Sequence, residues 1–88
     1  MNKLRVLIAD DHVIVRDGLR AILGAQADIE VVGEATNGED AVLKTKELQP
    51  DVILMDITMP GMDGLEATRQ IRRLNPNVKI LVLTMQGC

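Results

Sequence analysis

The 88-residue sequence contains no phenylalanine, tyrosine or tryptophan. Its core must therefore consist of aliphatic side chains and methionine, and stacking of aromatic side chains on nucleic-acid bases is excluded. Hydrophobic residues still make up 47% of the chain and charged residues 26%, which is the balance of a globular protein rather than a disordered one. The length predicts one domain with a thin core, since domains usually have about 100 to 150 residues.

Cysteine and long apolar runs are also scarce. The single cysteine, Cys88, is the last residue, so it has no partner for an internal disulfide or a cysteine metal site. No apolar run approaches the roughly 20 residues that a membrane span requires, and no charged segment precedes a long apolar stretch as in a signal peptide. These absences predict a cytoplasmic protein without membrane contact.

Positive charge is not in excess, because the net charge is -3. Arg69, Arg72 and Arg73 come closest to a basic cluster, and their spacing favours the solvated face of a helix over a nucleic-acid surface. Nucleotide binding is disfavoured too, because neither a G-x-G-x-x-G turn nor a G-K-[ST] loop follows an expected strand.

Short apolar runs alternate with helical patterns along the chain. The runs predict strands at residues 4–9, 30–35, 52–55 and 79–83. Between the first two, an apolar stripe at helical spacing predicts a helix that ends near Gly24. The stripe consists of Val15, Leu19, Ile22 and Leu23.

Two further helices are expected. Asn37 is a favourable N-cap for a helix that continues to Gln49, because Pro50 prevents its continuation. Asp63 and Glu66 resemble a capping box before the last helix. One face of that helix is expected to contain Ala67, Ile71 and Leu74.

This alternation predicts an α/β fold with a parallel sheet covered by helices on both faces. Functional residues of such sheets gather at the carboxyl ends of the strands. Asp10, Asp11, Asp56 and Thr84 all stand at expected strand ends.

Three carboxylates at neighbouring strand ends repel one another unless a cation joins them. Mg²⁺ suits such oxygen ligands and Mn²⁺ is the alternative. Asp11, Asp56 and the Thr58 carbonyl are the expected direct ligands, and Asp10 is expected to act directly or through water. Asp56 could then act as a nucleophile on phosphorus, and the Thr84 hydroxyl could donate to the phosphoryl group.

Simpler interpretations exist for each residue. A lone aspartate at a strand end is usually a turn or cap residue, and Thr84 is an ordinary strand residue by type. His12 is expected to be a solvent-facing residue of the first helical turn rather than a ligand or base. The methionines Met55, Met59, Met62 and Met85 are expected to fill gaps in the packing.

The segments LRVLIADDH, VRDGLRAIL, DVILMDITMPGMDGLEATRQIR and ILVLT together resemble receiver domains of bacterial two-component response regulators. The resemblance covers residues 4–84 and is greatest to the NarL/FixJ subfamily, whose receivers precede a LuxR-type helix-turn-helix domain. It implies a flavodoxin-like (CheY-like) doubly wound sheet with strand order 2-1-3-4 over these elements. It also implies that Asp56 accepts a phosphoryl group from a histidine kinase and that Thr84 is the switch hydroxyl.

By this resemblance, residues 1–88 form a truncated receiver. A fifth strand, its phosphoryl-contacting lysine and the DNA-binding effector domain would be missing, which implies weak metal binding and slow or absent phosphorylation. Lys3 and Lys79 cannot replace the lysine, because each is expected at the start of a strand. The apolar fourth strand would be an unpaired edge, which predicts self-association.

Two other functions remain open. A metal-dependent phosphohydrolase could use an aspartyl nucleophile on a similar sheet, although Thr58 stands where such enzymes usually have a second aspartate. The chain could also be an inactive, self-associating fragment.

Overall fold

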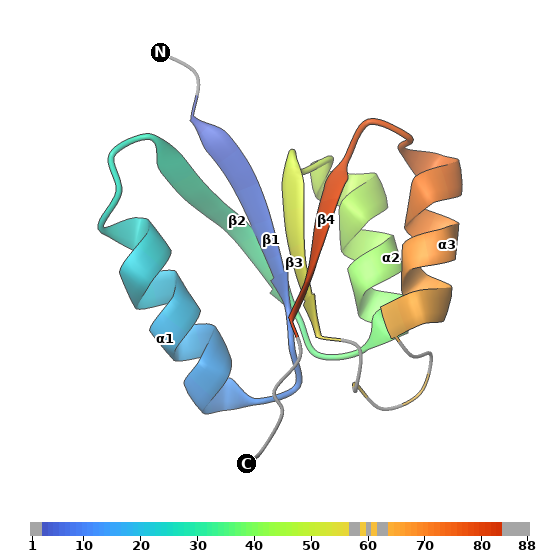
Figure 1. Cartoon of the computed structure of the whole chain (residues 1–88), viewed down its shortest axis with the longest axis horizontal. Helices are drawn as coiled ribbons and strands as arrows, with labels where there is room; N and C mark the ends of the chain where they lie inside the picture. The colour runs from blue at the N-terminus through green and yellow to red at the C-terminus, as the bar shows by residue number, and fades with distance from the viewer. Residues whose placement is uncertain (1–2, 57–58, 60, 62–63, 84–88) are drawn as a thin grey trace.

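The computed structural model describes residues 3–56, 59, 61 and 64–83. Strands and helices alternate along the chain, and the four strands form one parallel sheet in the order β2-β1-β3-β4 (Figure 1). The elements are β1 (Leu4–Ala9), α1 (Val13–Gly24), β2 (Ile29–Ala35), α2 (Gly38–Leu48), β3 (Val52–Asp56), α3 (Gly64–Leu74) and β4 (Lys79–Leu83). The predicted fold class and strand order are therefore confirmed.

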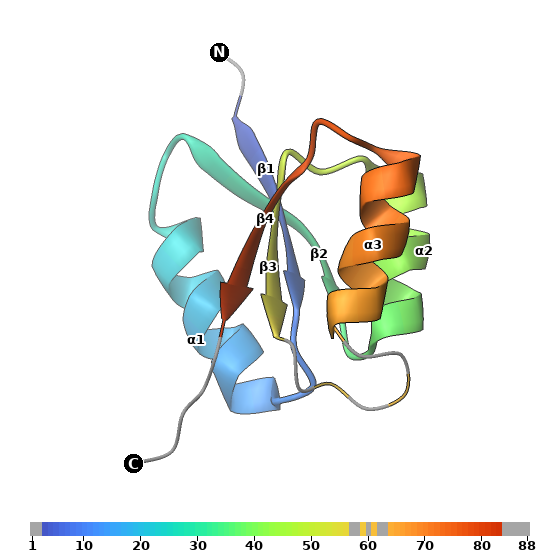
Figure 2. The ribbon, with the colours of Figure 1, turned by 45° about the vertical axis from the view of Figure 1, so that its right-hand side comes forward.

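Helices cover both faces of the sheet. In two views, α1 lies on one face while α2 and α3 lie together on the other (Figures 1 and 2). The larger core cluster is under α2 and α3 and includes Leu7, Ile53, Met55, Met59 and Ile71. A smaller cluster under α1 is formed by Val6, Ile8 and Leu54. The buried Met55 and Met59 fill the packing as expected.

Two predicted apolar faces are narrower than the sequence pattern suggests. Leu19 and Leu23 of α1 pack against the sheet, but Ile22 is 65% exposed. In α3, Ala67 and Ile71 are fully buried whereas Leu74 is 46% exposed. Helix α1 lies mainly against β1 and β2, and none of its residues is fully buried. Ile22 and Leu74 therefore continue the predicted apolar patterns without being buried.

The boundaries of α2 follow from its capping residues. The Asn37 side chain accepts a hydrogen bond from the Asp40 amide at 2.7 Å, as its predicted N-cap role requires. At the other end, Gln49 has the left-handed conformation (φ 49°) and its amide donates to the Thr45 carbonyl. The helix thus ends at Leu48, one residue before the predicted end. The capping residue predicted for α3, Asp63, lies outside the described residues.

Strand β4 is at the edge of the described sheet. It pairs with β3, while Leu81 and Val82 remain 56% and 46% exposed. Lys79 pairs with Val52 where β4 begins, so it lies at the end of the sheet opposite the carboxyl ends of the strands. None of the described helices is long and apolar enough to cross a membrane.

Candidate metal and phosphoryl site

Strand pairing brings Asp10 and Asp56 together. Ala9 of β1 lies opposite Met55 of β3, so the next residue of each strand emerges at the same edge of the sheet. Both carboxylates are buried, with 0% exposure of each residue. Burial of two acids side by side is unfavourable without a compensating cation, which indicates a functional rather than a structural origin.

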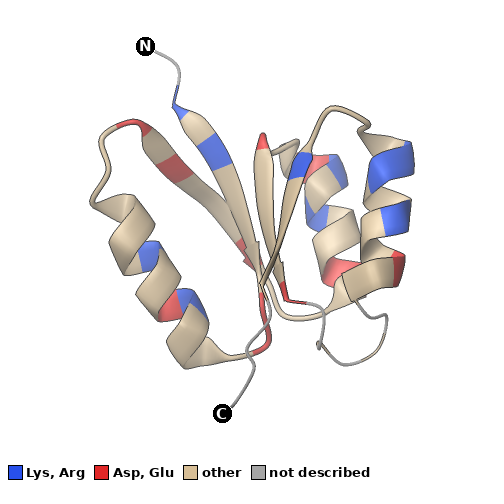
Figure 3. Ribbon diagram, viewed as in Figure 1, with Lys and Arg blue, Asp and Glu red and all other residues tan. Residues whose placement is uncertain are grey.

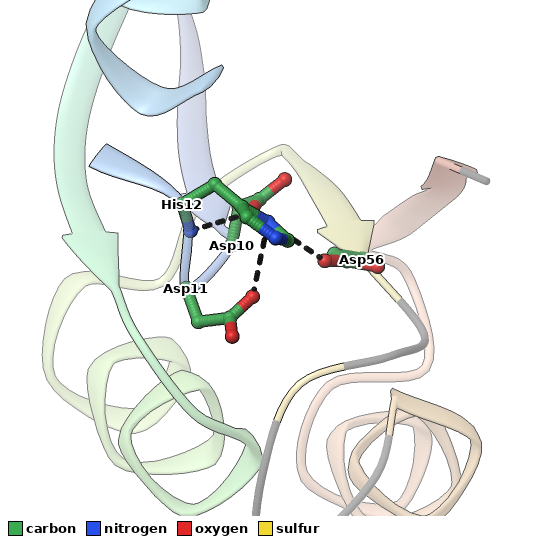
Figure 4. A group of neighbouring side chains, drawn as sticks. All are labelled: Asp10, Asp11, His12 and Asp56. Carbon is green, nitrogen blue, oxygen red and sulfur yellow. Dashed lines mark hydrogen bonds and ion pairs between the residues drawn. The ribbon is translucent and has the colours of Figure 1, made fainter. Parts of the chain in front are cut away.

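Asp11 and His12 complete the cluster (Figure 4). Asp11 is the second residue after β1 and its side chain is 31% exposed, while His12 is the N-cap residue of α1. The His12 Nδ1 atom lies 2.8 Å from Asp10 Oδ1, 3.2 Å from Asp11 Oδ1 and 3.7 Å from Asp56 Oδ2. One ligand atom from each of the four residues lies within 4.8 Å of the other three.

The neighbouring carboxylates raise the pKa of His12. Its hydrogen bond to Asp10 and then the charge of Asp11 raise the pKa of the imidazole above the ordinary value of 6.5. The side chain is 54% exposed, so the predicted solvent exposure is confirmed in part. His12 is the N-cap residue rather than a member of the first helical turn, and its Nδ1 atom faces the acids.

The backbone of Asp10 is held from two sides. Its amide donates to the Ala35 carbonyl at 2.9 Å, and its carbonyl accepts from Arg16 Nη1 at 2.7 Å. Arg16 also pairs through Nε with Glu34 at 3.0 Å. Sequence reasoning did not single out Arg16, although its place one turn into α1 after the two aspartates could have signalled this contact.

The donor set fits a hard divalent cation. Carboxylate oxygens are the side-chain ligands that Mg²⁺ and Mn²⁺ prefer. Within the described part of the chain, the buried Asp10 Oδ2 atom has no hydrogen-bond partner. Figure 3 shows acidic residues at the carboxyl ends of β1 and β3. A cation at this edge would balance the negative charge of the three carboxylates.

Two predicted site residues, Thr58 and Thr84, lie outside the described residues. The described structure therefore brings together Asp10, Asp11 and Asp56 of the predicted set and adds His12. It leaves the roles assigned to the two threonines as predictions.

Known proteins resemble both the sequence and the fold. Residues 6–88 match the sequence profile of the response regulator receiver domain. The chain is 59% identical over 81 residues to the transcriptional regulatory protein LiaR of Bacillus subtilis, covering 92% of this chain and 38% of LiaR. It thus spans less than half the length of this relative.

Two solved structures have a fold similar to that of this chain. The response regulator domain of Thermotoga maritima CheB superposes with a TM-score of 0.91 at 41% identity, covering 94% of this chain and 61% of that one. A CheX–CheY–BeF₃–Mg²⁺ complex from Borrelia burgdorferi superposes with a TM-score of 0.89 at 30% identity, covering 99% and 66%.

Proposed function

This chain belongs to the response regulator receiver domain family, and we propose that Asp56 accepts a phosphoryl group from the phosphohistidine of a histidine kinase. The observation that carries the proposal is the convergence of Asp56 with Asp10 and Asp11 at one edge of the sheet. Asp10 Oδ1 accepts the His12 amide as in a turn, but this contact does not account for the buried Asp10 Oδ2 atom, which has no hydrogen-bond partner among the described residues.

The chemistry follows from the carboxylate. An Asp56 oxygen attacks phosphorus and forms a phosphorus–oxygen bond, while the phosphorus–nitrogen bond of the donor breaks and its imidazole retains the electron pair. The product is an acyl phosphate on Asp56. In our proposal the Thr84 hydroxyl then donates a hydrogen bond to the phosphoryl group and links the modified site to the rest of the domain.

Asp10, Asp11, Asp56 and the Thr58 carbonyl would hold the Mg²⁺ ion, or Mn²⁺ in its place. When bound, the ion supplies positive charge that offsets the charge of the transferring oxygens. The similarity to a protein solved with BeF₃ and Mg²⁺ supports this assignment, as does the buried Asp10 Oδ2 atom without a partner among the described residues.

The wider role is a proposal drawn from the relatives. LiaR is named as a transcriptional regulatory protein, and this chain covers 38% of its length. We propose that residues 1–88 belong to the receiver of a cytoplasmic transcriptional regulator, in which DNA is bound only by a separate helix-turn-helix effector domain.

A signalling role is favoured over an enzymatic one. The described fold is that of receiver modules, and the residue two positions after Asp56 is Thr58 rather than the aspartate that phosphohydrolases commonly use as a general acid. We therefore propose that the chain takes part in its own phosphorylation without turning over a phosphate ester.

Phosphorylation at Asp56 tests the function directly. The protein is incubated with acetyl phosphate and Mg²⁺, and the acyl phosphate is reduced with borohydride and located by peptide mass spectrometry. We expect slow modification at Asp56 and none in Asp56→Asn, with Asp17→Asn as a control that retains the reaction. Modification that persists in Asp56→Asn contradicts the proposal.

The edge strand suggests a second copy of the chain as a partner. The exposed Leu81 and Val82 lie on a strand whose outer edge meets no other described strand, and such edges readily pair. We expect a weight-average mass that rises with concentration in sedimentation equilibrium, and a smaller rise for Leu81→Lys. A mass that stays monomeric at all concentrations contradicts this self-association.

A further inference from the structure

The position of His12 relative to the acids matches that of a metal ligand. Its Nδ1 atom lies 2.8 Å, 3.2 Å and 3.7 Å from oxygens of Asp10, Asp11 and Asp56. Ligand atoms about 2.1 Å from one ion lie roughly 3 Å apart when they are neighbours in its shell. The separations from Nδ1 are therefore close to those of neighbouring ligands, and side-chain shifts would draw all four ligand atoms, which lie within 4.8 Å of one another, around one ion.

The donor chemistry decides which ion this set prefers. Mg²⁺ selects oxygen ligands and gains little from an imidazole, whereas Zn²⁺ binds histidine nitrogen and carboxylate oxygen together in four-coordinate sites. We propose that His12 Nδ1 joins Asp10, Asp11 and Asp56 to form a site for a first-row transition ion such as Zn²⁺, in competition with Mg²⁺. This inference rests on the proposed function, because it uses the same carboxylates.

The local backbone leaves the His12 ring available for this role. His12 is the N-cap of α1 with an extended backbone (φ -97°, ψ 115°), and its side chain makes no capping hydrogen bond. The side chain is 54% exposed, so the ring stands at the surface of the acidic cluster. The proton on Nδ1 passes to solvent when the nitrogen coordinates, as for any histidine ligand.

Asp10 supplies independent evidence for a cation among these residues. It is fully buried, and its Oδ2 atom has no hydrogen-bond partner within the described structure. A buried carboxylate oxygen without a partner is costly, and an ion coordinated by Oδ2, alone or together with Oδ1, removes that cost. His12 alone does not, because its Nδ1 and amide both contact Oδ1.

Calorimetric titration with Zn²⁺ and with Mg²⁺ tests the inference. The protein carries no affinity tag, and Cys88→Ser is introduced throughout so that the thiol does not bind zinc. His12→Gln keeps the size and polarity of the side chain but removes the imidazole nitrogen. We expect the Kd for Zn²⁺ to rise about tenfold or more, and the Kd for Mg²⁺ to change by less than about threefold.

Two results would overturn the inference. Equal Zn²⁺ affinity in His12→Gln means that the ring is not a ligand, and tighter binding of both ions means that the ring obstructs the site. Nitrogen-15 NMR of the wild-type imidazole provides a second readout, because coordination shifts Nδ1 differently from protonation. An unchanged Nδ1 resonance at saturating Zn²⁺ also counts against ligation.

Asp56→Asn separates this inference from the proposed function. If both hold, this variant weakens Zn²⁺ and Mg²⁺ alike, whereas His12→Gln weakens Zn²⁺ selectively. If Asp56→Asn leaves Mg²⁺ binding unchanged, the proposed magnesium site fails, while the effect of His12→Gln on Zn²⁺ still decides the role of His12.

Discussion

His12 contacts one oxygen of Asp10 twice: its backbone amide and its Nδ1 atom each lie 2.8 Å from Asp10 Oδ1. The amide contact is available to any residue at position 12, whereas the Nδ1 contact requires histidine. The backbone contact is therefore a general feature of the turn after β1, whereas the side-chain contact depends on the imidazole that lies beside Asp11 and Asp56.

The pKa of His12 can be measured directly, because it is the only histidine in the chain. We expect proton NMR of the metal-free protein to give a value above 6.5, since the hydrogen bond to Asp10 and the charge of Asp11 favour the imidazolium. Asp10→Asn should lower the pKa toward 6.5, while Asp17→Asn should leave it unchanged. A value at or below 6.5 in the wild-type protein would refute this prediction.

The same shift makes stability depend on pH. Because the folded pKa is raised, the stabilising contribution of His12 is fully present below about pH 6.5, the unfolded value, and is lost as pH rises through the folded pKa. Urea denaturation of the wild-type protein and His12→Gln should therefore differ most in mildly acidic buffer. A difference that grows at alkaline pH would contradict the sign.

Arg16 should contribute more to stability than Arg20, although both contact Glu34. The Arg16 side chain is 14% exposed and also donates to the Asp10 carbonyl, whereas that of Arg20 is 54% exposed. Arg16→Ala should reduce the free energy of unfolding by about 1–3 kcal/mol, and Arg20→Ala by less than about 1 kcal/mol. If urea denaturation gave equal losses of unfolding free energy for the two variants, the contact of Arg16 with the Asp10 carbonyl would add nothing to stability.

Loss of the Asn37 cap should destabilise α2. Its side chain accepts from the Asp40 amide, so Asn37→Ala leaves that amide without its partner. We expect a loss of about 1 kcal/mol in chemical denaturation. Asn77→Ala, at an exposed turn position, serves as the control and should change stability by less than about 0.5 kcal/mol. No difference between the two variants would argue against the cap.

Core packing on the α3 side can be tested with a matched pair. Ile71 is fully buried and Leu65 of the same helix is 59% exposed. Ile71→Val should cost about 1 kcal/mol through the small cavity it leaves, and Leu65→Val less than about 0.5 kcal/mol. Thermal or urea unfolding measures both, and a larger effect at Leu65 would contradict the placement of the helix.

Much of the fold and part of the site could be predicted from the sequence. Alternating apolar runs and helical stripes depend on local spacing, so the strands and helices were placed to within one or two residues. Asp10, Asp11 and Asp56 were found because the carboxyl ends of parallel strands meet at one edge of the sheet.

Tertiary structure decided what local spacing does not encode. Ile22 continues the apolar stripe of α1 but is exposed, because the helix covers only part of the sheet. Arg16 is important only because α1 packs beside β2 and brings its side chain to Glu34 and to the Asp10 carbonyl. His12 was predicted to face solvent, yet the turn after β1 directs Nδ1 to acids from two strands. The sequence by itself thus determined the elements and the three carboxylates. Only the packed chain determined which nitrogen joins them, because that depends on the path of the backbone between strand and helix.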